Sequence, residues 1–574
     1  MMKTKYIALA VSLILSLSGI AQHNEEVTIE GTYRPKVNKV DKILMQPEKP
    51  QQSFTMPGAV IQVLDIEHRF PLEIEKMSAL SYNTKNAQLP TPAKNFLMAG
   101  FGSRISPLFL YKHNSNLTKR LALGVGIKHY SSWLDIKDYA PSGFMNNALN
   151  IGLTSTRFKD VQMGWDVYYK NDLYHYYGLN LKDYPLTSAE IDDYCGGVTF
   201  NTIGTHFGLV PTSTRVGEVN HKVGVDYHYT FDNNGEKEHF ADLEYGFGYT
   251  QNWWGSKSHP QKLGVDLGFQ YDIFRSQYGV NGVNRMLFKV NPFFEMSDEF
   301  YHLHLGVLMD GATPADLVDK FFAVRPDVRG GLFVLDKKLE FYAGLNGGRK
   351  MFTYSEVVEK NPFYGSLPYY HGWRVQNVKL GFDGGVRTNI GEFLDLHLGV
   401  RYRHTDNDPL FVNNRKDDFT SIYNRFSLVY DETRLVSVLG DVRMKLRSGL
   451  AVELGVSYNH YDLSKYQYAW NRPAVEGRAK VCYDINDQLS FNASFLYQGG
   501  RYTATVPNMV DPAQVTGAKK LKDVYDLGFG TDWHVNEQLT VFVKLNNLAN
   551  QRYQLYDDYP VEGFQTFAGL KMTF

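Results

Sequence analysis

Long hydrophobic runs are almost absent from this chain of 574 residues. Beyond residues 1–21, no apolar stretch approaches the roughly 20 residues that a membrane-spanning helix needs. A chain of this kind can still cross a membrane as strands, because a closed β-barrel satisfies every backbone hydrogen-bonding group inside lipid. The composition therefore excludes a helical membrane protein but not a barrel.

Cysteine and net charge are scarce as well. The only cysteines are Cys195, in an expected loop, and Cys482, on the polar face of an expected strand. We therefore expect no structural disulfide. The formal net charge is −1, which leaves no basic surplus for a nucleic-acid partner.

Signatures of catalysis are also missing. The chain has no phosphate-cradling glycine loop, no zinc-protease helix and no nucleophile-elbow pentapeptide. His302 and His304 lie two residues apart on one expected strand face, but a metal site needs three or four converging ligands. We therefore expect no enzyme activity, no cofactor and no bound metal.

Aromatic residues and glycine are abundant, with 39 Tyr, 36 Phe and 50 Gly. Residues 394–404, LDLHLGVRYRH, alternate strictly between apolar and mostly polar residues, and similar runs occur at 300–309, 449–461 and 488–498. Successive side chains of a strand point to opposite faces, so each run has one apolar and one polar face. Such strands separate two different environments.

These runs repeat from about residue 95 to the C-terminus, and short connections alternate with long ones. Tight turns occur at 336–338, 447–449 and 486–488, and long connections at 176–196, 351–374, 406–433 and 503–520. Expected strands at 391–405 and 434–446 flank the third long connection. Short periplasmic turns and long outer loops are typical of transmembrane barrels. We predict an all-β, antiparallel transmembrane barrel of about 22 strands, or 20 if the weakest segments are not strands.

Both ends of the chain carry features of secreted outer-membrane proteins. Lys3 and Lys5 precede a short apolar run, and small residues follow it up to Ala21, which is typical of a signal peptide. The last strand ends on Phe574, which resembles the insertion signal of outer-membrane barrels. We predict a signal peptide at 1–21, an N-terminal segment at 22–94 and a barrel at 95–574. The barrel would contact the outer-membrane lipids of a Gram-negative bacterium.

A short motif precedes the final strand. Asn547, Leu548, Asn550 and Tyr553 form an Asn-Leu-x-Asn-x-x-Tyr run. This run resembles the last hairpin of TonB-dependent outer-membrane receptors, and residues 95–116 and 466–473 resemble a Bacteroidota group of receptor-like barrels. The resemblance implies 22 strands, transport of a solute and a periplasmic energy-coupling partner.

The N-terminal segment departs from that family. TonB-dependent receptors carry a plug of well over a hundred residues, whereas residues 22–94 provide only about 73. The opening residues EEVTIEGTYRP resemble the first strand of a plug, but no glycine-rich plug sequence follows. We interpret the segment as a partial plug. The candidate partner-binding strand within it comprises Val27, Thr28, Ile29, Glu30, Gly31 and Thr32.

Charged residues on the polar strand faces are candidates for a binding wall. Guanidinium groups give directed, paired hydrogen bonds to carboxylates or phosphates. They could hold an anionic solute, or they could pair with carboxylates on neighbouring strands and keep the wall hydrated. The candidate lumen-lining residues are His302, His304, Asp395, His397, Arg401, Arg403 and Lys480.

The long connections are rich in aromatic and acidic residues. Aromatic runs contain Tyr174, Tyr176, Tyr177, Trp253, Trp254, Tyr369, Tyr370 and Trp373. We interpret these as membrane-interface girdles and not as ligand-stacking sites. The acidic residues in 405–409 and 415–418 are interpreted as turn formers and not as a cation site.

Two functions follow from this sequence. The first is transport or binding of a solute by a receptor-like barrel. The second is a structural subunit of a larger outer-membrane complex, with barrel or lipoprotein partners. In that case the N-terminal strand would pair with a partner, and the proline-rich stretch after it would act as a tether.

Overall fold

The computed structural model describes the chain from Asn95 to Phe574. The described residues are 95–158, 160–212, 215–254, 260–277, 282–313, 321–366, 373–391, 393–414, 425–446, 449–505, 513, 515 and 517–574. All of them belong to the compact unit Pro57–Phe574. The predicted signal peptide, the segment 22–94 and its strand Val27–Thr32 lie outside the described residues.

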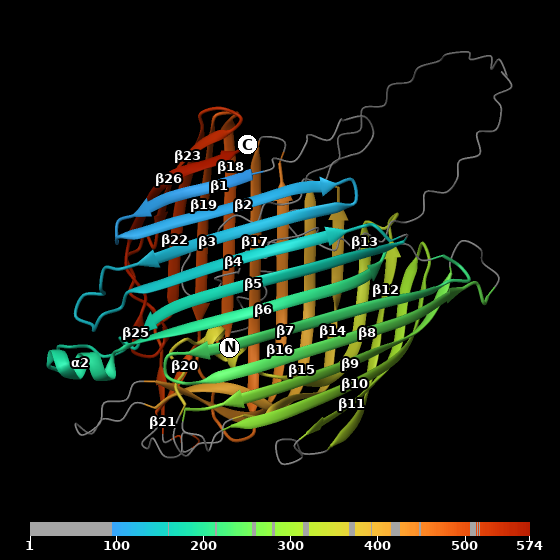
Figure 1. The fold of residues 1–574 in the computed structure, drawn as a ribbon, viewed down its shortest axis with the longest axis horizontal. Helices are drawn as coiled ribbons and strands as arrows, with labels where there is room; N and C mark the ends of the chain where they lie inside the picture. Colours follow the sequence, from blue (N-terminus) through green and yellow to red (C-terminus); the bar gives the residue numbers. More distant parts are fainter. Residues whose placement is uncertain are drawn as a thin grey trace, which may run out of the picture. The chain divides into compact units, whose positions relative to one another are not determined.

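Twenty-two antiparallel strands form one closed sheet (Figure 1). Each strand pairs with its neighbours along the chain, and the ring closes where β1 pairs with β26. The strands are β1 (Asn95–Gly102), β2 (Ser106–Thr118), β3 (Leu121–Ser132), β4 (Phe144–Ser155), β5 (Val161–His175), β6 (Gly197–Pro211), β7 (Val219–Asp232), β8 (Lys237–Gln251), β9 (Gln261–Arg275), β10 (Val283–Ser297), β11 (Tyr301–Thr313), β12 (Phe322–Val334), β13 (Leu339–Met351), β14 (Val375–Ile390), β15 (Leu394–Asn413), β16 (Phe426–Lys445), β17 (Leu450–Leu463), β18 (Val475–Asn486), β19 (Leu489–Gly499), β22 (Val524–His534), β23 (Leu539–Asn546) and β26 (Gln565–Thr573). The predicted barrel of 22 strands is confirmed.

The alternating pattern assigns the two faces of the wall. On β15, Leu398 and Val400 are 51% and 45% exposed on the outer face. Arg401 and Arg403 point to the other face, where both bond to Asp383 of β14. A closed barrel with an apolar outer face is the architecture of proteins that cross a membrane as strands.

The two ends of the barrel differ in the length of their connections. Residues 335–338 and 487–488 form tight turns at one end, which we call the short-turn rim, as predicted, and β16 ends and β17 begins at the same rim. The described residues of the connections 133–143, 176–196, 352–374 and 547–564 lie at the other end, the long-connection rim. β1 begins and β26 ends at the short-turn rim.

Some of the long connections contain regular structure of their own. The helices α2 (Ser188–Tyr194) and α3 (Tyr354–Lys360) and the hairpins β20 (Tyr502–Thr505) with β21 (Gly517–Lys520) and β24 (Gln554–Tyr556) with β25 (Tyr559–Pro560) all lie at the long-connection rim. Among the described residues, no helix is long and apolar enough to span a membrane.

The prediction that 406–433 forms a connection is wrong at both ends. β15 continues to Asn413 and β16 begins at Phe426, after a register shift between Thr405 and Asp408. The longer ribbon buries Leu410, Val412 and Val429 in one cluster with Trp470. This burial stabilises the extended pairing of β15 with β16. The strand pattern was obscured because both faces of the ribbon are buried there.

The two faces of β15 should tolerate substitution very differently. We expect Val400→Arg to destabilise the barrel by about 2 to 4 kcal/mol, because Val400 lies well inside β15 on its outer face and a guanidinium there would face the lipid layer. Asp395→Asn, on the opposite face, should have little effect. Denaturant titration of the two variants in bilayers checks this, and equal tolerance would mean that the faces are reversed.

Candidate functional site

The predicted lumen-lining residues are engaged in ion pairs along the inner wall. His302 Nε2 lies 2.8 Å from Glu340 Oε1. His304 lies between Glu295 and Asp327, at 3.0 and 3.1 Å. These histidines are held by carboxylates of their own wall, so they do not form an open set of metal ligands.

The remaining predicted wall residues also contact neighbouring residues of the wall. Asp383 accepts hydrogen bonds from Arg401 Nε at 2.9 Å and from Arg403 at 2.6 Å. His397 Nε2 is 2.6 Å from the Tyr342 hydroxyl. Asp395 accepts a hydrogen bond from Asn389, and Lys480 lies opposite Glu453 in the register of β17 and β18. The candidates occupy separate sectors on β11, β15 and β18 and are not gathered into one site.

A second group of charged wall residues binds the connection 352–374, and unlike the lumen-lining candidates these residues converge on one segment. Arg285 of β10 is fully buried and donates to the carbonyl oxygens of Phe352 and Arg374, at 3.1 and 3.3 Å. Its guanidinium also pairs with the buried Asp272, with Nε to Oδ2 at 2.7 Å, and lies 5.1 Å from the Trp373 ring centroid. One wall residue therefore holds both ends of this connection.

Further wall strands hold the helix α3 inside this connection. The Glu238 carboxylate of β8 accepts hydrogen bonds from the backbone N–H groups of Tyr354 and Ser355. The Tyr354 hydroxyl donates to Asp232 at the end of β7, at 2.8 Å. Lys170 of β5 lies 3.6 Å from Glu359. The first half of the connection is thereby attached to the wall from β5 to β10.

The following residues of the same connection bind the opposite wall. Phe426 of β16 donates to the Phe363 carbonyl and accepts from the Gly365 N–H, both at 2.9 Å. Phe363 also stacks on Tyr559 with ring centroids 3.4 Å apart. In a ring of 22 strands, β16 lies half a turn from β5, so residues 352–366 cross the mouth of the barrel.

Aromatic side chains fill the space around this crossing. We call the buried cluster the cap; it comprises Ile136, Ala140, Tyr176, Tyr177, Leu179, Cys195, Val198, Phe200, Phe274, Phe352, Tyr354, Val357, Val358, Phe363, Tyr364, Trp373, Phe426, Leu428, Tyr430 and Tyr559. Four connections and the strands β6, β9 and β16 contribute to it. The cap is the largest buried apolar cluster in the part of the chain that the structure describes, and aromatic rings supply much of its buried area.

The girdle interpretation of the aromatic runs is correct for some residues and wrong for others. Trp253 and Trp254 are exposed, at 42% and 66%, as girdle residues should be. Tyr176, Tyr177 and Trp373 are buried in the cap instead. Their sequence pattern does not separate the two fates, because both use aromatic side chains with one polar end. Tyr369 and Tyr370 lie outside the described residues.

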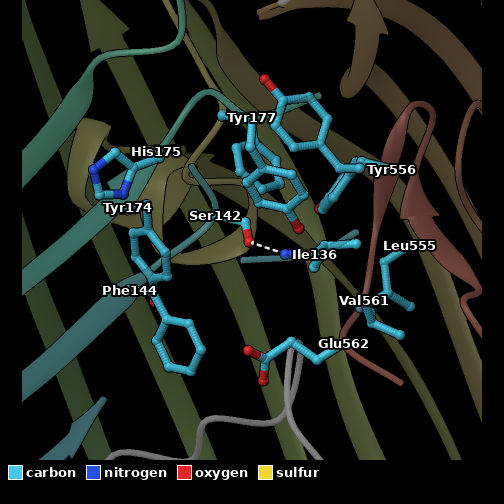
Figure 2. Close-up of a pocket in the computed structure, with 12 residues that line it drawn as sticks. Ile136, Ser142, Phe144, Tyr174, His175, Tyr177, Leu555, Tyr556, Val561 and Glu562 are labelled. Atoms are coloured by element: carbon cyan, nitrogen blue, oxygen red, sulfur yellow. Dashed lines mark hydrogen bonds between the residues drawn. The ribbon is translucent and has the colours of Figure 1, made fainter. Parts of the chain in front are cut away.

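A small pocket opens beside the cap (Figure 2). Aromatic rings of Phe144, Tyr174 and Tyr177 line one side and residues of the 547–564 connection line the other, including Val561 and Glu562. The pocket has little room, and its one buried carboxylate is already engaged by neighbouring residues.

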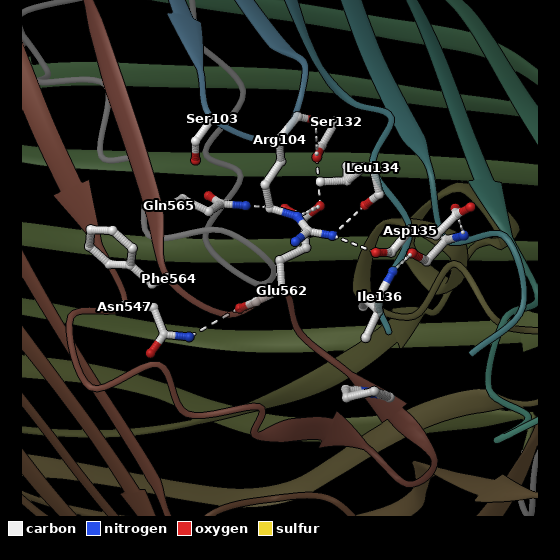
Figure 3. A network of polar contacts seen from close by, with 12 residues as sticks. Ser103, Arg104, Ser132, Leu134, Asp135, Ile136, Asn547, Glu562, Phe564 and Gln565 are labelled. Atoms are coloured by element: carbon white, nitrogen blue, oxygen red, sulfur yellow. Dashed lines mark hydrogen bonds and ion pairs between the residues drawn. The ribbon is translucent and has the colours of Figure 1, made fainter. Parts of the chain in front are cut away.

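That carboxylate is the centre of a polar network (Figure 3). Glu562 Oε1 accepts from Arg104 Nε at 3.0 Å and from the Ser132 hydroxyl at 2.6 Å, and Gln565 binds Oε2. Arg104 also donates to the carbonyls of Leu134 and Asp135. The network joins the β1–β2 turn to the connections 133–143 and 547–564.

The Asn-Leu-x-Asn-x-x-Tyr run has a structural role in this region. Asn547 and Asn550 adopt φ of 49° and 48°, a conformation that asparagine tolerates better than most residues. The Asn547 amide donates to the carbonyls of Gln551 and Glu562, and the Tyr553 hydroxyl donates to Asp526 at 2.7 Å. The run therefore shapes and anchors the last connection.

One cluster has the spacing of cation ligands. His404, Asp406 and Glu432 bring their ligand atoms within 4.8 Å of one another. Lys379 Nζ already lies 2.6 Å from Asp406 and 3.4 Å from Glu432. The ammonium group therefore already pairs with both carboxylates of this cluster. Residues 415–418 lie outside the described residues.

No family model and no curated protein matches this chain. Solved structures do match it. The siderophore receptor PirA from Acinetobacter baumannii is 10% identical with a TM-score of 0.60, covering 85% of this chain and 81% of that chain. The ferric-catecholate import receptor Fiu from E. coli K12 is 10% identical with a TM-score of 0.59, covering 85% and 83%. The copper transporter OprC is 12% identical with a TM-score of 0.56, covering 85% and 82%.

At these identities the likeness shows the fold. The chain has a receptor-like barrel of 22 strands, and the apolar outer wall identifies it as an outer-membrane barrel, as the sequence predicts. The structures that resemble it are receptors and a transporter, not enzymes.

Breaking the Arg285–Asp272 pair should be costly. We expect Arg285→Met to destabilise the protein by about 3 to 5 kcal/mol, because it leaves a buried carboxylate unpaired. Arg401→Met is the matched control, since the Arg401 side chain is 48% exposed and such pairs contribute about 0 to 1 kcal/mol. Denaturant midpoints of both variants check this, and similar midpoints would contradict it.

Residues 352–366 should loosen as pH rises through neutrality, because Ser366 of this segment hydrogen-bonds to the buried carboxyl group of Glu236. Burial raises the pKa of Glu236, in the turn between β7 and β8, from 4.5 to about 7, and nearby Asp232 adds to the effect. Because the folded protein holds the Glu236 proton more tightly than the unfolded chain, protonation of Glu236 favours the folded state. This contribution to the free energy of unfolding is complete below about pH 4.5 and is lost as the pH rises through about 7.

Amide hydrogen exchange in residues 352–366, corrected for intrinsic rates, should therefore accelerate between about pH 5 and pH 8, because this range spans the Glu236 pKa of about 7. Glu236→Gln cannot ionise and should remove most of this pH dependence. An unchanged slope in that variant would exclude Glu236 as the cause.

Proposed function

We propose that the protein is an outer-membrane, receptor-like barrel that binds a solute at its long-connection rim and passes it through the lumen. The observation that carries this proposal is the wall itself. It is a 22-stranded ring whose inner face is lined by paired charges and whose fold is shared with siderophore receptors and a copper transporter.

In this proposal the long-connection rim faces the cell exterior and the short-turn rim faces the periplasm. His302, His304, Asp395, His397, Arg401, Arg403 and Lys480 would then line the path of the solute. Because Arg401 and Arg403 are already paired with Asp383 and the candidates are spread over separate strands, we propose a hydrated, weakly selective wall and not a single tight binding site.

The N-terminal segment 22–94 has its own place in the proposal. It would act as a partial plug, and Val27–Thr32 would offer a strand to a periplasmic energy-coupling protein. The same residues serve the alternative function described next, so the segment does not by itself distinguish the two.

A second candidate function is a structural subunit that transports nothing and docks other barrels or lipoproteins. The observation that favours it is the cap, which joins opposite walls through buried aromatic rings. A structural subunit does not need an open lumen, so a bridge across the mouth of the barrel is compatible with this role.

Conductance in planar bilayers separates the two functions. We expect little current from the full-length protein, and stepwise current after deletion of residues 22–94 or after the cap is released by Arg285→Met. Arg434→Met serves as the control, because the Arg434 side chain is 54% exposed, pairs with Asp462 and lies outside both the lumen and the cap.

A barrel that stays closed in every variant while remaining folded would overturn transport and support the structural role. Folding is checked by the shift in gel mobility on heating, which reports an intact barrel. A large current from the unmodified protein would instead show that the bridge across the mouth does not restrict solute passage.

A further inference from the structure

Two outward-facing cations lie side by side at the long-connection rim, on the neighbouring strands β8 and β9 (Figure 1). Lys237 begins β8 and Arg275 ends β9, and the two residues lie directly opposite each other in the strand register. Both are exposed, whereas Glu238 and Phe274, next to them in the chain, are fully buried on the inner side. Side chains alternate between the faces of a strand, so Lys237 and Arg275 point outward. We call them the basic pair.

The basic pair lies just beyond a group of aromatic residues on the outer face. His239, two residues along β8, accompanies the pair on this face. The Tyr227 hydroxyl lies 2.9 Å from His239 Nδ1, and the Tyr229 ring stacks on the His239 ring with centroids 4.4 Å apart. Further along the same face of β8, Leu243 is exposed. Tyrosines flank the apolar band of a barrel at the headgroup level, so the basic pair is placed among lipid headgroups.

The basic pair departs from the usual arrangement of outward charges. Like charges directly opposite each other destabilise an antiparallel pair of strands. Arg434 on the outer face of β16 instead lies opposite Asp462 of β17, with Nη1 3.6 Å from Oδ2. In the part of the chain that the structure describes, no carboxylate pairs with Lys237 or Arg275. An anion bound between these two cations would relieve their repulsion.

The Arg275 side chain is already oriented for such a contact. Its Nη1 donates to the carbonyl oxygens of Phe274 and Val283, at 2.9 and 3.4 Å, and to Asn284 Oδ1 at 2.8 Å. Gly282 leaves room for it, because a Cβ there would lie 3.3 Å from Arg275 Cδ. Within the described residues, the opposite edge of the guanidinium, formed by Nε and Nη2, donates no hydrogen bond. Such an edge binds two oxygens of one phosphate.

The charge and shape of the basic pair match a phosphate monoester. This group carries about −1.5 to −2 charges at neutral pH and has three strong acceptor oxygens. Two oxygens can meet the Arg275 edge while the third accepts from the Lys237 ammonium. A carboxylate offers only two oxygens and one charge, and a zwitterionic headgroup brings a cation of its own.

We propose that the basic pair binds the phosphate-monoester headgroup of a lipid in the membrane leaflet next to the long-connection rim. Basic residues beside the apolar band of a membrane protein attract anionic headgroups. The acyl chains of the lipid would lie along the exposed outward residues of the same two strands, which include Leu243 and Leu267. In the orientation proposed above this is the outer leaflet. The inference does not require that the barrel transports a solute.

Competition between two lipids with the same acyl chains tests this proposal. The full-length protein is mixed in detergent with equal amounts of dioleoyl phosphatidic acid and dioleoyl phosphatidylcholine, and native mass spectrometry counts the retained lipids. We expect preferential retention of phosphatidic acid, and we expect Lys237→Gln with Arg275→Gln to raise its dissociation constant about tenfold or more. The matched control, Lys379→Gln with Arg434→Gln, removes the same charge from cations that are already paired with carboxylates. It should leave the preference unchanged.

Chemical protection of Lys237 locates the bound lipid. In nanodiscs, phosphatidic acid should slow the acetylation of Lys237 relative to phosphatidylcholine, whereas Lys222 on the inner face should react equally in both, as peptide mapping would show. Mobility on heating confirms that each variant is folded. Equal retention of phosphatidic acid by the wild type and the Lys237→Gln, Arg275→Gln variant would overturn the proposal. Protection of Lys237 by inorganic phosphate alone would also overturn it, because it would indicate a site for a soluble anion. Neither measurement reads conductance, so failure here is separate from failure of the proposed transport.

Discussion

The whole molecule depends on the closure of its backbone hydrogen-bond ring. Inside lipid no water can satisfy an exposed strand edge, so every N–H and C=O of the wall needs a neighbouring strand. β1 and β26 supply the last pair, through contacts from Phe96↔Thr573 to Gly102↔Phe567. Once the ring is closed, alternation decides, for example on β15, that Leu398 and Val400 face lipid while Arg401 and Arg403 face the lumen.

The cap shows how such a wall can organise the segments outside it. Arg285, Glu238 and Asp232 come from three wall strands and hold one connection by its backbone and by Tyr354. Charged groups are costly to bury without partners, and here the partners are the connection and neighbouring wall residues. The wall therefore sets the position of the connection, and the aromatic rings fill the remaining space.

The sequence predicted the barrel well because its strands carry a local signal. In β11, β15 and β19 the two-residue period identifies both strand and face, and tight turns set the direction. The extension of β15 past Thr405 was missed since the ribbon is buried on both faces, which removes the alternation. Sequence reasoning also left Tyr176 and Trp373 as girdle residues. Their burial depends on contacts such as Phe363 with Tyr559, which join residues far apart in the chain.

The seam of the ring has a consequence for how the chain reaches its final state. Asn95 bonds to the carbonyl of Phe574 across 479 positions of sequence, so the first strand to emerge waits for the last before either is satisfied. During that interval the partly formed sheet has two complementary open edges, and each is a template for pairing with another chain. Contacts this distant in sequence also form slowly. Until the two edges meet, the unfinished sheet is therefore exposed to pairing with other chains, and the hazard ends only when the last strand is in place.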